Sequence, residues 1–248
     1  MNRGGSEAGA SREPGLPPYQ AVLAETDWGS LQTAFGNGEC LPGVLARLLE
    51  PDPKVQVTAL SELSELVCHQ NSVYEATGPV AMFVAGILDH PSATTLRPYR
   101  EVPVRATWLN WLGSTAYDAS DEIVDRVKRY SPGFPAHGTT MAAFRDLRPM
   151  LCRAVEPFLR DSHEDVREAA GLAALVLAEH PALARRRDHL AVHARRILDT
   201  SGDDFNRRVA WKALRAWGHD VTGVEPLQEE PWDYGPHSDG RGDLEPPF

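Results

Sequence analysis

The chain has 248 residues, 42% of them hydrophobic and 24% charged, as in one large globular domain or a short repeat array. Its formal net charge of -10 is uneven: residues 25–142 carry -6, residues 143–217 carry +3 and residues 218–248 carry -7. The three cysteines, Cys40, Cys68 and Cys152, are far apart, which argues against a disulfide framework and against a cysteine-based zinc site.

Helical periodicity runs through most of the chain. Trp28, Leu31 and Phe35 first predict a short amphipathic turn that ends at Gly36. Apolar residues then recur at positions i, i+3, i+4 and i+7, as on the buried face of a helix. No segment shows the alternation typical of a strand. The expected helices cover 41–50, 54–69, 72–88, 102–117, 142–159, 163–179, 181–198 and 204–217.

Two stretches of the chain depart from this helical periodicity. Gly78-Pro79 lies inside the expected helix 72–88 and should kink or split it. Residues 119–141 hold a short helical piece at 122–130 and then a run of Ser, Pro and Gly. We therefore expect an irregular insertion over 119–141.

Both ends of the chain differ in composition from the middle. Residues 1–24 are rich in Gly, Pro, Ser and Ala, and they lack the apolar core of a signal peptide. Residues 219–248 form an acidic tail rich in Pro and Gly. Such segments bury too little apolar surface to offset the entropy of ordering, so we expect both to be disordered. No apolar run approaches the ~18–20 residues that span a bilayer, and we expect a cytoplasmic protein that contacts no membrane.

A short motif recurs at the turns between expected helices. An Asp lies in the turn, a Val-Arg or similar pair opens the second helix, and small residues follow. The Asp can cap the second helix, the Arg can reach an Asp of a neighbouring repeat, and alanines allow close packing. The motif occurs as Asp161 with Asp165-Val166-Arg167 and Ala169-Ala170, as Asp203 with Arg207-Arg208-Val209-Ala210, and as Asp52 with Val55-Gln56, where Gln replaces Arg.

This motif resembles the HEAT-repeat family over about residues 41–217. The resemblance implies an all-α fold, a right-handed, armadillo-like α-solenoid of about four helix pairs that occupies residues 25–218. The second pair departs from the motif, because Asp89-His90-Pro91 leads into a long loop. In this family the second helices usually line a concave face that binds other macromolecules.

The first half carries a narrower resemblance. The residues concerned are Trp28, Leu31 and Phe35-Gly36, then Pro42, Leu45 and Leu48, then His69-Gln70 with Ser72-Val73-Tyr74 and Ala76-Thr77. In this pattern the chain is similar to uncharacterised bacterial HEAT-like proteins, some of which resemble immunity proteins of toxin systems. The resemblance implies an immunity protein that neutralises a toxin domain by covering it.

The sequence offers little catalytic or metal-binding chemistry. His163-Glu164 is a single dyad, whereas a di-iron site of the HEAT-type hydroxylases needs several. His189 and His193 could share a helix face, but no carboxylate or thiol is spaced to complete a metal site. No phosphate-binding loop, nucleophile elbow or metalloprotease motif is present. We expect no enzyme activity, no cofactor and no metal.

The arginines between residues 185 and 215 favour an alternative function. Arg185-Arg186-Arg187 and Arg195-Arg196 lie in the net-positive section, near Trp211. HEAT-like DNA glycosylases hold the phosphate backbone on such a face, so nucleic acid is the second candidate partner. The first is another protein, bound without catalysis. The candidate contact residues on the expected concave face are Trp108, Trp111, Arg167, Arg207, Arg208 and Trp211.

Overall fold

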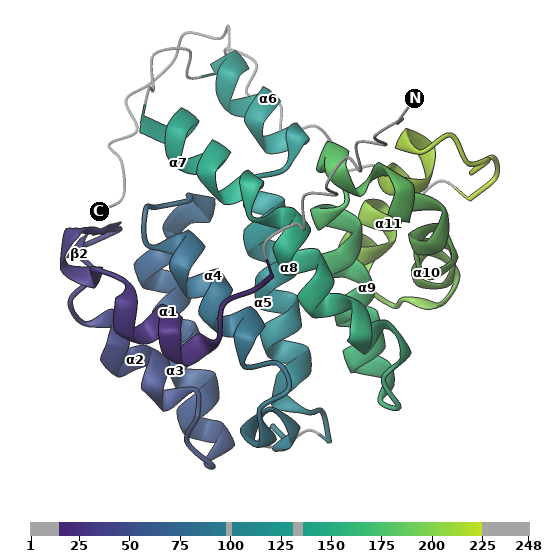
Figure 1. Cartoon of the computed structure of the whole chain (residues 1–248). Coiled ribbons are helices and arrows are strands. Elements are labelled where there is room, and N and C mark those ends of the chain that lie inside the picture. The colour runs from purple at the N-terminus through teal and green to yellow at the C-terminus, as the bar shows by residue number, and fades with distance from the viewer. Residues whose placement is uncertain (1–14, 98–100, 131–135, 225–248) are drawn as a thin grey trace, which may run out of the picture.

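The computed structural model describes residues 15–97, 101–130 and 136–224, and this part of the chain is mostly helical (Figure 1). The all-α expectation is confirmed. The helices are α1 (Tyr19–Glu25), α2 (Leu41–Arg47), α3 (Pro53–Val67), α4 (Thr77–Gly86), α5 (Val104–Asp118), α6 (Asp121–Tyr130), α7 (Ala136–Asp146), α8 (Arg148–Val155), α9 (Glu164–Leu177), α10 (Arg187–Thr200) and α11 (Asp204–Ala216). Short 3-10 helices lie at η1 (Trp28–Ser30), η2 (His69–Asn71), η3 (Pro91–Thr94), η4 (Glu156–Arg160) and η5 (Pro181–Arg186).

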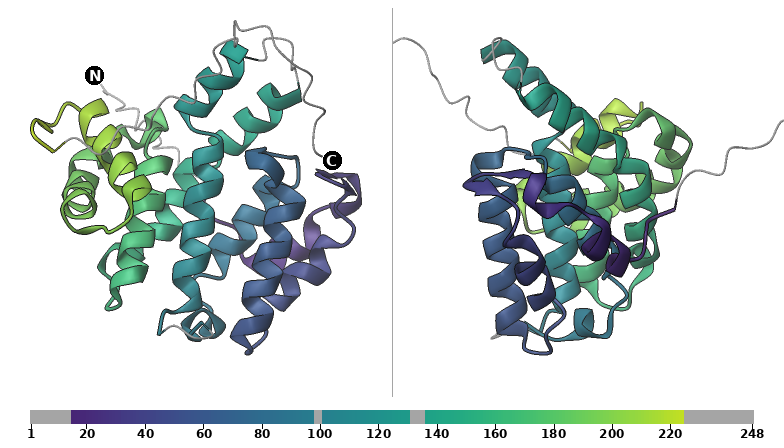
Figure 2. Two further views of the ribbon diagram at one scale, coloured as in Figure 1. Left: turned by 180° about the vertical axis from the view of Figure 1, so that it is seen from behind. Right: turned by 60° about the vertical axis from the view of Figure 1, so that its left-hand side comes forward.

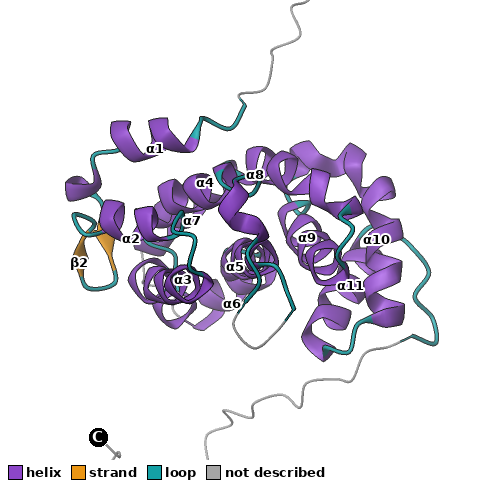
Figure 3. Cartoon of the chain, turned by 90° about the horizontal axis from the view of Figure 1, so that it is seen from below, coloured by secondary structure: helices purple, strands orange, loops and turns teal. Residues whose placement is uncertain are grey.

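Antiparallel helix pairs organise the body. The helices α2 and α3 pack together, as do α4 with α5, α8 with α9, and α10 with α11. The second members, α3, α5, α9 and α11, contact one another in this order, while α4 contacts α8. Figure 3 looks along these helices from below, and Figure 2 shows α6 and α7 projecting beyond them.

Helix α9 is the centre of the core. Every residue from 169 to 178 is buried, because α5, α8, α10 and α11 all contact this helix. The approach to α5 is close: a Cβ atom placed on Gly113 would lie 3.2 Å from the Cα atom of Ala173. Gly113 and Ala173, which are small residues outside the motif, therefore allow these two helices to pack together.

Aspartates cap two of the three helices that the motif opens. The Asp52 side chain accepts a hydrogen bond from the Lys54 amide at 2.8 Å, and Asp203 accepts one from Asn206 at 3.0 Å. Asp161 accepts one from the amide of His163 at 2.8 Å. The expected capping role is confirmed for Asp52 and Asp203. It is wrong for Asp161, because His163 precedes α9 and is itself the N-cap residue, without a side-chain cap hydrogen bond.

The region around Gly36 is a hairpin, so the expected amphipathic turn over residues 28–36 is wrong beyond η1. Strand β1 (Gln32–Thr33) pairs antiparallel with β2 (Gly36–Asn37), and two-residue strands are too short to show alternation in the sequence. Gly36 has a φ of 133°, which glycine adopts without steric cost. Phe35 is 66% exposed instead of buried.

Proline positions account for two further corrections. Helix α4 begins at Thr77, so Pro79 lies in its first turn and causes no kink inside a helix. The Thr77 hydroxyl oxygen accepts a hydrogen bond from the Tyr74 amide at 2.8 Å, next to this start. The expected helix 142–159 is divided, because Pro149 opens α8 and Pro157 lies in the first turn of η4.

The expected irregular insertion at 119–141 is wrong for residues 136–141, which are helical, whereas its run of Ser, Pro and Gly at 131–135 lies outside the described residues. The helix expected at 122–130 is confirmed as α6, and residues 136–141 belong to α7. The Ser120 hydroxyl accepts a hydrogen bond from the Ile123 amide at 3.3 Å and so supports the first turn of α6. The Arg145 guanidinium of α7 pairs with Asp121, which joins the two helices.

The expected disorder over 1–24 is wrong for residues 15–24. Tyr19 packs edge-on against Phe83 of α4 with ring centroids 5.6 Å apart, and Gly86 leaves room for this contact. Residues 1–14 lie outside the described part. In the expected tail, residues 219–224 are described, and Val221 and Val224 pack against the core, whereas 225–248 lie outside the described residues.

Candidate interaction surfaces

Two candidate contact residues are buried, so their expected role on a binding face is wrong. Trp108 is 0% exposed and Trp111 is 7% exposed. Their helix, α5, is packed between α4 and α3 on one side and α9 on the other. Neither indole N–H has a hydrogen-bond partner among the described residues, and the rings supply apolar contact area to the core.

Arg167 also does not reach a neighbouring repeat. It donates hydrogen bonds to the carbonyl oxygens of Asp161 at 2.8 Å and Ser162 at 2.7 Å, within its own turn. Arg105 makes the expected bridge instead: it pairs with Asp161 at 3.1 Å and donates to the Leu88 carbonyl at 2.8 Å. The Val104-Arg105 pair matches the motif and could have identified this residue from the sequence.

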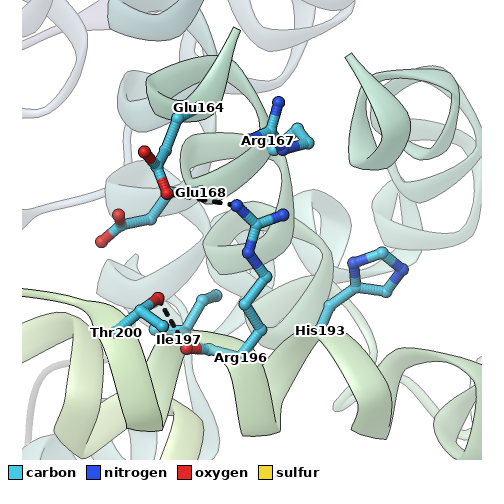
Figure 4. A pocket seen from close by; sticks show the side chains of 7 residues that line it. All are labelled: Glu164, Arg167, Glu168, His193, Arg196, Ile197 and Thr200. Atoms are coloured by element: carbon cyan, nitrogen blue, oxygen red, sulfur yellow. Dashed lines mark hydrogen bonds and ion pairs between the residues drawn. The ribbon is translucent and has the colours of Figure 1, made fainter. Parts of the chain in front are cut away.

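A small pocket lies beside Arg167, between the first turns of α9 and helix α10 (Figure 4). Arg196 crosses it and pairs with Glu164 at 3.2 Å. The space left holds about one water molecule. Its lining residues are Glu164, Arg167, Glu168, His193, Arg196, Ile197 and Thr200. The pocket therefore offers ion pairs between helices and no room for a substrate.

The remaining three candidates lie on α11. We group six side chains of this helix, none of them fully buried, under the name α11 face. Arg208 lies over the Phe205 ring at 5.5 Å, and Arg215 lies over the Trp211 ring at 5.1 Å. Arg215 is exposed and the other five are half-buried, and Phe205 and Trp211 also pack against the core. The α11 face consists of Phe205, Arg207, Arg208, Trp211, Lys212 and Arg215.

A polar junction borders the α11 face. Glu122 of α6 accepts hydrogen bonds from Lys212 at 2.7 Å and from the Tyr117 hydroxyl at 3.1 Å. Burial opposes ionisation of Glu122, but the hydrogen bond and charge of Lys212 hold its pKa below the ordinary value. Burial and the Glu122 charge raise the pKa of Tyr117 to about 12. Tyr117 also packs edge-on against Phe205 at 5.0 Å, so α5, α6 and α11 meet here.

The arginines between 185 and 215 are divided among several contacts. Arg187 donates to the Ala178 and Glu179 carbonyl oxygens at the end of α9, and Arg195 donates to the Asp220 carbonyl. Arg186 pairs with Glu156. Much of this positive charge therefore serves packing between helices.

Two of these arginines, Arg185 and Arg186, line an open groove between η4 and the start of α10. The groove has a volume of about 650 Å³. Its charged and titratable lining residues are Arg153, Glu156, Arg160, Arg185, Arg186 and His189. We call it the arginine groove. Sequence reasoning missed Arg153 and Arg160, because they belong to a different helix pair from Arg185.

The histidines noted in the sequence contact other side chains and backbone groups of the protein. His163 lies 2.9 Å from the Glu101 carbonyl, and the rings of His189 and His193 meet edge-on at 5.6 Å. Within the described residues, no three His, Cys, Asp or Glu side chains are placed to hold a metal ion.

None of the described helices is both long and apolar enough to span a membrane. Comparison of the chain with family models, curated proteins and solved structures found no match.

Proposed function

We propose that the chain is a non-catalytic, protein-binding α-solenoid whose α11 face contacts the partner. The observation that carries the proposal is the composition of this face: two arginines lie over two half-buried aromatic rings, and Arg215 is exposed. Aromatic and arginine side chains contribute most of the binding energy at many protein interfaces. A partner that presents carboxylates around an apolar patch would match this surface.

The helix pairs support the solenoid part of the proposal. Four pairs recur along the described part of the chain, and capping aspartates precede the second helix in two of them. We propose a right-handed arrangement of HEAT-like repeats, in which α3, α5, α9 and α11 form the layer that binds. A bacterial, cytoplasmic immunity protein that covers a toxin domain is one form of this function, and it rests on the sequence resemblance.

Affinity capture with paired variants tests the proposal. The tagged protein, the variant Arg207→Glu/Arg208→Glu and the control Lys128→Glu/Arg129→Glu are each used to capture proteins from nuclease-treated lysate. Both variants change the net charge by the same amount, and the control residues are exposed on α6. We expect one stoichiometric protein with the wild type and the control that is lost with the α11 variant.

Two results would count against this function. Identical capture by all three proteins would show that the α11 face makes no contact. Recovery that depends on nucleic acid would support the alternative, a nucleic-acid backbone binder, and would fall steeply with salt. Circular dichroism of each variant establishes that its helices are intact.

A further inference from the structure

The arginine groove takes no part in the function proposed for the α11 face. Arg153, Glu156 and Arg160 line one wall, from α8 and η4, and Arg185, Arg186 and His189 line the other, from η5 and α10. Pro157 and Leu159 complete the lining. The groove is open to solvent, and two neighbouring helix pairs form it.

The groove carries excess positive charge. It contains four guanidinium groups and one carboxylate, and that carboxylate, Glu156, pairs with Arg186. Arg160 and Arg185 are both exposed, and within the described ranges neither has a hydrogen-bond or ion-pair partner. Like charges that converge on one cavity repel each other, so an anion between them would be stabilised.

The positive potential extends along α10. The pKa of His193 lies below its ordinary value because of burial and, after it, the neighbouring His189, Arg160 and Arg196. The charge of Arg160 therefore also affects His193, which lies one helical turn beyond the groove.

We propose that the arginine groove binds a compact run of linked phosphates. Guanidinium groups donate paired hydrogen bonds whose geometry matches phosphate oxygens. A volume of about 650 Å³ is of the size that holds a small molecule. A compact polyphosphate places all its charge between the arginines of the groove, whereas most of the charge of a long polyanion would lie beyond them.

Isothermal titration calorimetry of the full chain tests this site, with sodium tripolyphosphate and a nucleoside triphosphate as probes. The variant Arg160→Gln/Arg185→Gln removes the two unpaired guanidiniums. The variant Lys128→Gln/Arg129→Gln removes two exposed charges on α6 and serves as the matched control. We expect binding of at least one probe to the wild type and the control, and binding about tenfold weaker or more in the groove variant.

The two probes distinguish the sources of the phosphate. Equal affinity for both assigns the site to the phosphate chain alone, and tighter binding of the nucleoside triphosphate adds recognition of the nucleoside. The proposal is overturned if neither probe binds, or if the groove variant binds as the wild type does. It is also overturned if an oligonucleotide binds more tightly than either probe and the groove variant loses that binding.

Discussion

Gly113 shows how one residue sets the distance between two helices. It faces Ala173 across the α5–α9 contact, where an added Cβ atom would lie 3.2 Å from the Ala173 Cα atom. We expect Gly113→Val to lower the free energy of unfolding by about 2–3 kcal/mol, because the backbone of α9 cannot yield. Gly43→Val, at a site with open space, should change it by less than about 0.5 kcal/mol. Urea denaturation measures both, and equal effects would contradict the packing described for Gly113.

Asp118 gives the protein a pH-dependent stability. Burial raises its pKa from 3.8 to about 7, so the folded state holds a proton that the unfolded state releases at lower pH. Stability from this group is present below about pH 4 and is lost as pH rises toward 7. We expect Asp118→Asn to raise the free energy of unfolding at pH 8 by roughly 2 kcal/mol and to leave it little changed near pH 4. Denaturation at both pH values measures the difference, and a gain of the same size at pH 4 would refute this origin.

The roles of some single residues could be predicted from the sequence, and the roles of others could not. The capping aspartates were predictable because a cap depends on residues two or three positions away. Trp108 and Trp111 were placed on a binding face because periodicity shows which residues share a face, and does not show that both faces of α5 are covered. Arg148, which is fully buried and donates to the Ala116 and Ala119 carbonyls, was missed because its partners are distant in sequence.

Arg105 connects several elements of the fold. It joins the end of α4, the start of α5 and the turn before α9, and both members of its pair with Asp161 are 15% exposed. We expect Arg105→Met to cost about 2–4 kcal/mol of unfolding free energy, because Asp161 would keep a charge in a largely buried place. Arg47→Met removes an exposed pair with Glu62 and should cost no more than about 1 kcal/mol. Thermal denaturation compares the two variants, and equal losses of unfolding free energy would contradict the role of Arg105 in joining these elements.

Helix α6 depends on the junction at Glu122. Lys212 of α11 and Tyr117 of α5 both donate to this carboxylate. We expect Lys212→Met to speed amide hydrogen exchange in residues 121–130 and to leave α9 protected, because α9 is buried by other contacts. Lys128→Met is the control, because Lys128 lies on α6 but away from the junction at Glu122. Unchanged exchange in α6 would show that other contacts hold it.

The element boundaries show why regions between helices were harder to predict than the helices. Periodicity identified α3, α5, α9 and α11, whose apolar stripes are long. The hairpin at Gly36 and the division of 142–159 depend on a glycine conformation and on prolines that open new helices. Composition alone also suggested disorder at residues 15–24, where Tyr19 of α1 packs against Phe83 and His90 and Val22 is buried in the core.

At the scale of the whole fold, two surfaces of the described residues carry groups of arginines, although the net charge of the chain is -10. The α11 face combines it with aromatic rings, and the arginine groove concentrates it in a cavity. The two surfaces use different residues. A protein partner and a phosphate ligand are therefore separable by mutation, and neither set of variants should affect the other binding event.

The affinity of the purified complex tests whether the partner binds the α11 face. Calorimetry would compare the captured partner's binding to the wild type, to Arg207→Glu/Arg208→Glu and to Lys128→Glu/Arg129→Glu. We predict a dissociation constant at least about tenfold higher for the α11 variant, since opposed charges at an interface centre weaken binding, and an unchanged value for the control. The same dissociation constant for all three proteins would contradict the placement of the partner on the α11 face.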